Sequence, residues 1–160
     1  MNNYTLVSRF KAICDTGILA RFNQHSPTIE SIKFIENQLG IVLPETFVAV
    51  SSQCLAYTDW FAGIGGDYEW SSHILAQNRS FHNGEDAFLP SNLILFTKGY
   101  DLIYDCFDLS NRNENGNVSI VYCYLSEVND SMEIQDIEHV SYSFDTYLDL
   151  ILSGWEKGRK

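Results

Sequence analysis

The sequence is short of positive charge. It holds ten Lys and Arg residues against twenty-one Asp and Glu residues, which gives a formal net charge of −11 at pH 7. A protein that binds nucleic acid through phosphate contacts needs a basic surface. The longest basic cluster is Lys157, Arg159 and Lys160 at the C-terminus, a pattern typical of a solvated tail. The composition therefore argues against a nucleic-acid ligand.

Long apolar runs and a leader-like N-terminus are missing as well. No run approaches the ~18 residues that span a bilayer, and the first residues lack the charged-then-apolar order of a signal peptide. The cysteines are few, widely spaced and outside any CxxC or Cys/His pair: Cys14, Cys54, Cys106 and Cys123. This spacing predicts buried free thiols rather than a zinc site. We therefore expect a cytoplasmic protein with no membrane segment, no metal and no cofactor.

What the sequence does contain is typical of a folded domain. Apolar residues make up 45 % of the chain and aromatic residues 14 %. This composition excludes a disordered tail, a collagen-like repeat and a coiled coil. The length of 160 residues is that of one ordinary domain, so we expect residues 1–160 to form a single domain.

The negative charge gathers in the second part of the chain. Residues 99–156 hold twelve acids and one base, Arg112, whereas residues 1–98 hold nine acids and six bases. The natural complement of an acidic surface is a partner protein with a basic surface. The alternative, that this charge serves solubility alone, stays open.

Apolar periodicity predicts helices in the N-terminal part. Residues 3–15 place apolar side chains at helical spacing. Ser26 and Pro27 form a cap and first turn for a second helix, which ends at Gly40. A shorter helix restarts at Leu43 and Pro44.

The middle of the chain predicts strands, and the end predicts a further helix. We expect a strand–turn unit at 57–64, a short helix at 74–78 and a polar loop at 81–87. Three strands are expected to follow, at 93–96, 102–109 and 118–125. Ser143 caps a final amphipathic helix that Gly154 closes. Together these elements predict an α+β fold, a single domain with a central, mainly antiparallel sheet flanked by N-terminal helices and a C-terminal helix.

Five short motifs stand in an order that resembles the SUKH superfamily. They are IENQLG at 35–40, VLPETF at 42–47, Trp60 with Phe61, LPSNLI at 89–94 and SFDTYL at 143–148. The resemblance covers residues 26–153. The chain has Ser51–Cys54 where the family pattern usually has Asn-Gly, which leaves the subfamily open.

The resemblance implies a binding protein without catalytic residues. Bacterial members of the superfamily are mostly immunity proteins that neutralise polymorphic toxins, often nucleases, and this compact chain looks more like that branch. We therefore expect stoichiometric binding of a cognate toxin with a basic surface. One alternative is a regulatory protein-interaction module of the fungal cell-wall regulator type. Another is a small hydrolase built on His73, His82, Glu85 and Asp86.

Segments that contain both aromatic and acidic side chains supply the candidate partner contacts, because interfaces favour such combinations. They are Asp59, Asp67, Tyr68, Glu69, Trp70, Tyr100, Asp101, Asp105 and Asp108. In a strand, residues 101 and 105 share a face and residue 108 faces the other side. This geometry argues against a shared metal site for the last three acids.

Overall fold

The computed structural model describes residues 3–16, 22–23, 28–53, 56–57, 73–84, 87–97, 102–113, 117–128 and 130–158. Its helices are α1 (Asn3–Asp15), α2 (Ile29–Leu39), α3 (Glu45–Gln53), α4 (His73–Asn83) and α5 (Phe144–Lys157). Its strands are β1 (Phe22–Asn23), β2 (Ala56–Tyr57), β3 (Leu93–Leu95), β4 (Ile103–Arg112), β5 (Val118–Val128) and β6 (Ser131–Ser141).

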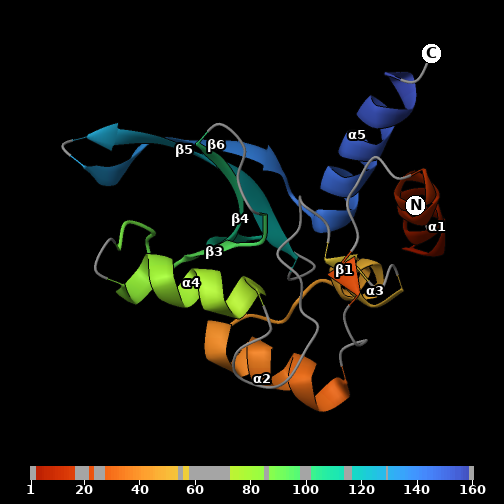
Figure 1. The fold of residues 1–160 in the computed structure, drawn as a ribbon, viewed down its shortest axis with the longest axis horizontal. Helices are drawn as coiled ribbons and strands as arrows, with labels where there is room; N and C mark the ends of the chain where they lie inside the picture. Colours follow the sequence, from red (N-terminus) through yellow and green to blue (C-terminus); the bar gives the residue numbers. More distant parts are fainter. Residues whose placement is uncertain are drawn as a thin grey trace.

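The main sheet has four strands in the order β3-β4-β5-β6, and each neighbouring pair is antiparallel. The strands β1 and β2 pair separately. Helices precede the sheet in the chain and one helix follows it (Figure 1). The predicted α+β fold, with a mainly antiparallel sheet flanked by N-terminal helices and a C-terminal helix, is confirmed.

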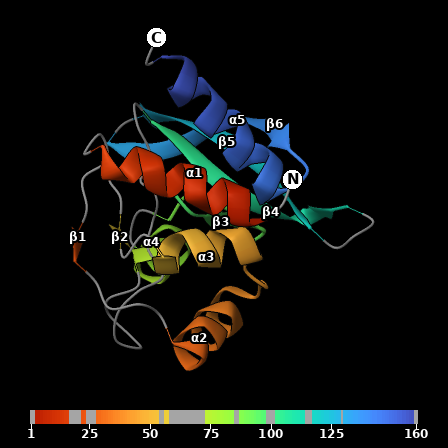
Figure 2. The same ribbon diagram turned by 90° about the vertical axis from the view of Figure 1, so that its right-hand side faces the viewer.

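Each face of the sheet buries its own apolar cluster, because side chains alternate between the faces along a strand. Ile94, Phe107 and Ile120 belong to the larger cluster, together with residues of α1, α3 and α5. Figure 2 shows these three helices on the same side of the sheet. Cys106 and Cys123 belong to the smaller cluster on the other face. Their Sγ atoms lie 3.7 Å apart, and both are free thiols.

Aromatic rings fill the centre of the larger cluster. Phe47 of α3 packs edge-on against Phe107 of β4 and Phe144 of α5, with ring centroids 5.6 Å and 5.3 Å apart. Phe96 stacks on Phe107 at 4.3 Å. Such ring pairs add about 0.5–1.5 kcal/mol each beyond the area they bury. The centre of the core therefore joins the sheet to both α3 and α5.

Two predicted helix boundaries are wrong. The cap of α2 is Thr28, whose hydroxyl oxygen accepts a hydrogen bond from the Ser31 N–H, rather than Ser26. The predicted end at Gly40 is confirmed, because this glycine takes the left-handed conformation with φ of 67°. In α5, Ser143 is the cap as predicted, but the helix continues through Gly154 to Lys157.

Contacts to α1 explain why α5 does not end at Gly154. Arg9 of α1 donates two hydrogen bonds of 2.9 Å to the Glu156 carboxylate and one of 2.5 Å to Asp149. Trp155 also packs against the large core cluster. An internal glycine costs a helix only about 1 kcal/mol, so these contacts are sufficient to extend the helix by one turn.

Two further sequence predictions are corrected. The predicted polar loop at 81–87 begins inside α4, which continues to Asn83. No strand was predicted for β6, because its apolar positions do not alternate evenly. The structure gives the reason: the pairing of β6 with β5 shifts register twice. The predicted strand–turn unit at 57–64 falls within the described residues only at Tyr57, which lies in β2.

Candidate functional site

The outer part of the sheet carries an acidic and aromatic surface on one of its faces. In Figure 1 this part of β5 and β6 extends away from α5. We call it the acidic sheet face and define it by Ile103, Tyr122, Tyr124, Glu133, Asp136 and Glu138. The three acids are exposed, both tyrosines are half-buried and Ile103 is 36 % exposed.

Strand register places these six side chains on the same face. Tyr122 pairs with Glu138, and Tyr124 pairs with both Ile103 and Asp136. Glu133 pairs with Ser126, two residues along β5 from Tyr124. Paired residues of neighbouring strands project to the same side of a sheet, as do residues two apart in one strand.

Hydrogen bonding, burial and nearby negative charge raise the pKa of both tyrosines of this face above the ordinary value. The Tyr124 hydroxyl donates a 2.7 Å hydrogen bond to Glu138 Oε2, which raises the pKa of Tyr124 to about 12. Burial raises the pKa of Tyr122, and the negative charges of Asp105 and Glu138 add to that rise. The face therefore presents phenolic hydroxyls beside carboxylates.

Asp105 lies where the acidic sheet face meets the core. Its side chain is 7 % exposed, and the buried Tyr147 hydroxyl of α5 donates a hydrogen bond to Asp105 Oδ2. Burial raises the pKa of Asp105 to about 6, and the hydrogen bond from Tyr147 opposes that rise. The sequence predicts Asp105 as a partner contact, but the structure turns its carboxyl group toward the core and corrects that prediction.

Asp108 lies on the opposite face of β4 from Asp105, as the strand periodicity predicts. Its Oδ1 accepts hydrogen bonds from Asn92 Nδ2 at 3.1 Å and from the Ser110 hydroxyl at 2.6 Å. Asp108 thus helps to hold the turn before β3 against β4. The other predicted contacts lie outside the described residues: Asp59, Asp67, Tyr68, Glu69, Trp70, Tyr100 and Asp101.

Sequence analysis did not select the acidic sheet face as a site. A sequence signal was available, since Tyr122 and Tyr124 in β5, and Asp136 and Glu138 in β6, each stand two residues apart. Such spacing indicates one face of a strand. The signal could not be used in β6, because no strand was predicted there.

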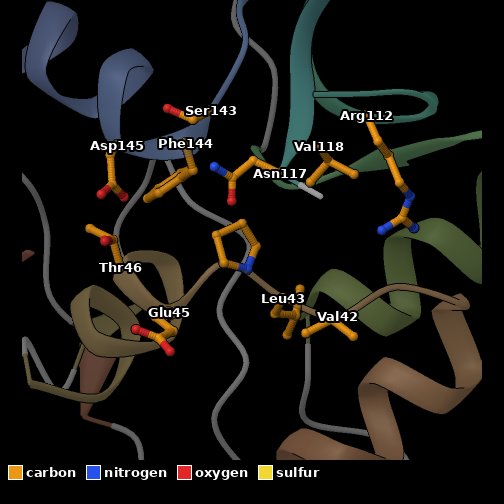
Figure 3. A pocket seen from close by; sticks show the side chains of 11 residues that line it. Val42, Leu43, Glu45, Thr46, Arg112, Asn117, Val118, Ser143, Phe144 and Asp145 are labelled. Carbon is orange, nitrogen blue, oxygen red and sulfur yellow. The ribbon is translucent and has the colours of Figure 1, made fainter. Parts of the chain in front are cut away.

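A pocket of about 360 Å³ lies at the other end of the sheet (Figure 3). It is bounded by the α2–α3 connection, the first turns of α3 and α5, and the β4–β5 end of the sheet. Its lining residues are Val42, Leu43, Pro44, Glu45, Thr46, Arg112, Asn117, Val118, Ser143, Phe144 and Asp145. In Figure 3 the carboxylates of Glu45 and Asp145 lie at one end, and the Arg112 guanidinium lies at the other.

Three observations on the described residues concern metal ligands, membrane-spanning helices and His82 of α4. Among the described residues, no group of three or more His, Cys, Asp or Glu side chains is arranged to hold a metal ion. None of the described helices has the length and apolar content needed to cross a membrane. The Nε2 atom of His82 lies 2.9 Å from the Leu93 carbonyl oxygen. Glu85 and Asp86 lie outside the described residues.

Comparison with known proteins identifies the family. No curated protein matches the chain significantly. At the level of protein families, residues 26–150 match the SMI1 / KNR4 family (SUKH-1). This match covers most of the chain and agrees with the resemblance expected from the five motifs. The chain therefore belongs to the SMI1 / KNR4 family, SUKH-1.

Proposed function

We propose that this chain is a cytoplasmic bacterial immunity protein, which binds a cognate toxin stoichiometrically and thereby neutralises it. The observation that supports this proposal is the acidic sheet face. Glu133, Asp136 and Glu138 project from it, and Arg112, at the pocket end, is the one Lys or Arg residue of β4, β5 and β6.

Charge and aromatic content suit this surface to a basic protein partner. A nuclease toxin must present positive charge to nucleic acid, and an acidic inhibitor is steered toward that charge over long range. Tyr122 and Tyr124 add apolar area with a polar tip, a combination that interfaces favour. Membership of the SUKH-1 family is consistent with a protein partner.

The proposed mechanism is occlusion rather than catalysis. Bound across the toxin's basic surface, the acidic sheet face would exclude the polyanionic substrate by volume and by charge. This mechanism requires a one-to-one complex and no turnover. It also predicts that inhibition is lost when binding is lost, with no change in the toxin's covalent structure.

Growth rescue tests the proposal. The chain is co-expressed with the toxin encoded beside its gene, and growth and a purified one-to-one complex are scored. Rescue together with a stable complex supports immunity. An absence of rescue, together with many weak partners in a pull-down, would instead support the regulatory interaction module.

Variants of equal charge test the surface itself. The triple variant Glu133→Gln, Asp136→Asn, Glu138→Gln removes three charges from the acidic sheet face. A matched control removes three acids that belong neither to this face nor to the β5–β6 hairpin, through Glu30→Gln, Glu85→Gln and Asp86→Asn. We expect rescue to weaken in the first variant and to persist in the control. Equal rescue by both variants would place the toxin on another surface.

A further inference from the structure

The pocket of about 360 Å³ is built by the first turns of two helices, each of which contributes a carboxylate. Glu45 stands in the first turn of α3, and Asp145 stands in the first turn of α5. Acids at these positions stabilise the positive end of a helix. In the part of the chain that the structure describes, neither carboxylate has a hydrogen-bonding or ion-pair partner.

A second, independent observation indicates an unfilled polar site. The hydroxyl of Thr46 is buried in the pocket wall, and it has no hydrogen-bond partner among the described residues. The whole residue is 1 % exposed. Buried hydroxyls are normally satisfied, and leaving one unpaired costs about 1–3 kcal/mol. In Figure 3 this hydroxyl lies between the carboxylates of Glu45 and Asp145.

The remaining walls give the pocket an apolar floor and a second polar end. In Figure 3 the side chains of Leu43 and Phe144 lie between the acidic end and Arg112, and Pro44 also lines the pocket. Arg112 has no ion pair with any described residue, although two acids line the same pocket. The guanidinium carries five N–H donors and no acceptor. This end of the pocket therefore suits hydrogen-bond acceptors, such as main-chain carbonyl groups or a carboxylate.

We propose that this pocket receives a Lys or Arg side chain from the partner protein. The charged head lies between Glu45 and Asp145, and the aliphatic stem lies along Phe144 and Pro44. Arg112 donates hydrogen bonds to main-chain carbonyl groups of the same partner segment. This inference rests on the proposed function and names a second contact site, at the opposite end of the sheet from the acidic face.

Charge favours a cationic side chain over an anionic group, and size favours a side chain over a whole small molecule. At the acidic end the two carboxylates outweigh the partial positive charges of the two helix ends, and the one guanidinium lies at the opposite end. Pockets that hold whole small molecules span roughly 300–1,000 Å³. A volume of about 360 Å³ is at the small end of that range and suits one or two side chains.

A small cationic probe tests the site without the toxin. N-acetyl-argininamide, which has no free carboxylate, is titrated into the ¹⁵N-labelled chain at constant ionic strength. Shift changes are followed at the amides of Thr46, Asn117 and Asp145. We expect saturable changes with a Kd on the order of 10 mM, because a single exposed charge contact is weak. N-acetyl-glutaminamide, which lacks the charge, is the neutral reference probe.

Variants identify the groups that bind the probe. Glu45→Gln combined with Asp145→Asn is expected to weaken binding by about fivefold or more. A control for helix-end chemistry is Glu30→Gln, which removes the first-turn acid of α2, outside the pocket. It has the same helix-end chemistry and should bind the probe as the wild type does.

Three results with the probes, and one in the growth assay, would overturn the inference. The first is no saturable shift with the cation, and the second is binding that survives loss of both acids. The third is preferential binding of N-acetyl-glutamate amide that Arg112→Gln abolishes, which would identify an anion site.

Growth rescue separates this inference from the immunity proposal. If the pocket variants rescue as the wild type does, the partner does not use the pocket and immunity stands; if the wild type fails to rescue, immunity itself falls.

Discussion

Asp105 carries a carboxyl group into the apolar core and gives the fold a specific pH dependence. Its pKa is about 6 in the folded chain against an ordinary value of 3.8, because burial disfavours the charged form. The folded state therefore holds this proton more tightly than the unfolded state does. Stability from this group is complete below the ordinary pKa and falls as the pH rises through about 6.

Asp105→Asn should remove that dependence, since the amide stays neutral and still accepts a hydrogen bond from Tyr147. From acidic to neutral pH, the free energy of unfolding of the variant should rise by about 2–3 kcal/mol relative to that of the wild type. This figure follows from about 1.4 kcal/mol for each unit of pKa shift. Urea unfolding of both proteins at several pH values measures this difference.

Tyr147→Phe provides the opposite change. Loss of the Tyr147 hydroxyl removes the hydrogen bond that lowers the pKa of Asp105. The free energy of unfolding should therefore fall more steeply as the pH rises through about 6.

The outcome that contradicts both predictions is a pair of parallel stability curves for the wild type and Asp105→Asn. It would show that the Asp105 carboxyl group is ionised without penalty in the folded chain.

At the scale of the elements, the two edges of the sheet are protected in different ways. Along β3, Asn78 of α4 donates to the Leu95 carbonyl oxygen at 2.7 Å and accepts from the Leu95 N–H at 2.8 Å. His82, one turn later, lies 2.9 Å from the Leu93 carbonyl oxygen. Side chains of a helix thus occupy the positions that a further strand would take. Along β6, acids and two register shifts discourage pairing with another copy of the chain.

Removing the Asn78 amide should therefore destabilise the fold strongly. In Asn78→Ala the outward N–H and C=O groups of Leu95 remain buried and lose their partners, which we expect to cost about 2–4 kcal/mol. Urea unfolding measures the loss, and hydrogen exchange at the Leu95 amide should accelerate. Asn83→Ala, at an exposed position of the same helix, should change the free energy of unfolding little. Equal effects of the two substitutions would contradict this role for Asn78.

Sequence periodicity predicted those elements whose burial follows one regular pattern. The apolar faces of α2 and α5 recur at helical spacing, and Ser143 caps α5 as predicted, whereas the cap of α2 is Thr28 instead of Ser26. Periodicity failed for β6, where bulges break the alternation, and for Asn78, whose role depends on a strand seventeen residues away. The same limit hid the acidic sheet face and the pocket, because each is assembled from separate segments. Glu45 and Asp145 stand one hundred residues apart.

At the scale of the whole molecule, the unpaired negative charge lies in a smaller region than the charge count along the sequence indicates. Among the acids of residues 99–156, Asp149 and Glu156 pair with Arg9, and Asp105 is buried. Five others, all exposed, lie in the β5–β6 hairpin: Glu127, Asp130, Glu133, Asp136 and Glu138. The hairpin is therefore the main source of an uncompensated negative field in the described residues.

A field of this kind should govern how fast a basic partner associates. Charges farther apart than about 8–10 Å are screened near physiological ionic strength, whereas close contacts in the formed complex are screened much less. Added salt should therefore lower the on-rate steeply and change the off-rate little. Neutralising Glu133, Asp136 and Glu138 should lower the on-rate by about 3- to 10-fold at low salt and flatten its salt dependence. Stopped-flow binding to the cognate toxin over a salt series measures both rates. If neither added salt nor these substitutions change the on-rate, the hairpin charge serves solubility and the partner docks elsewhere on the molecule.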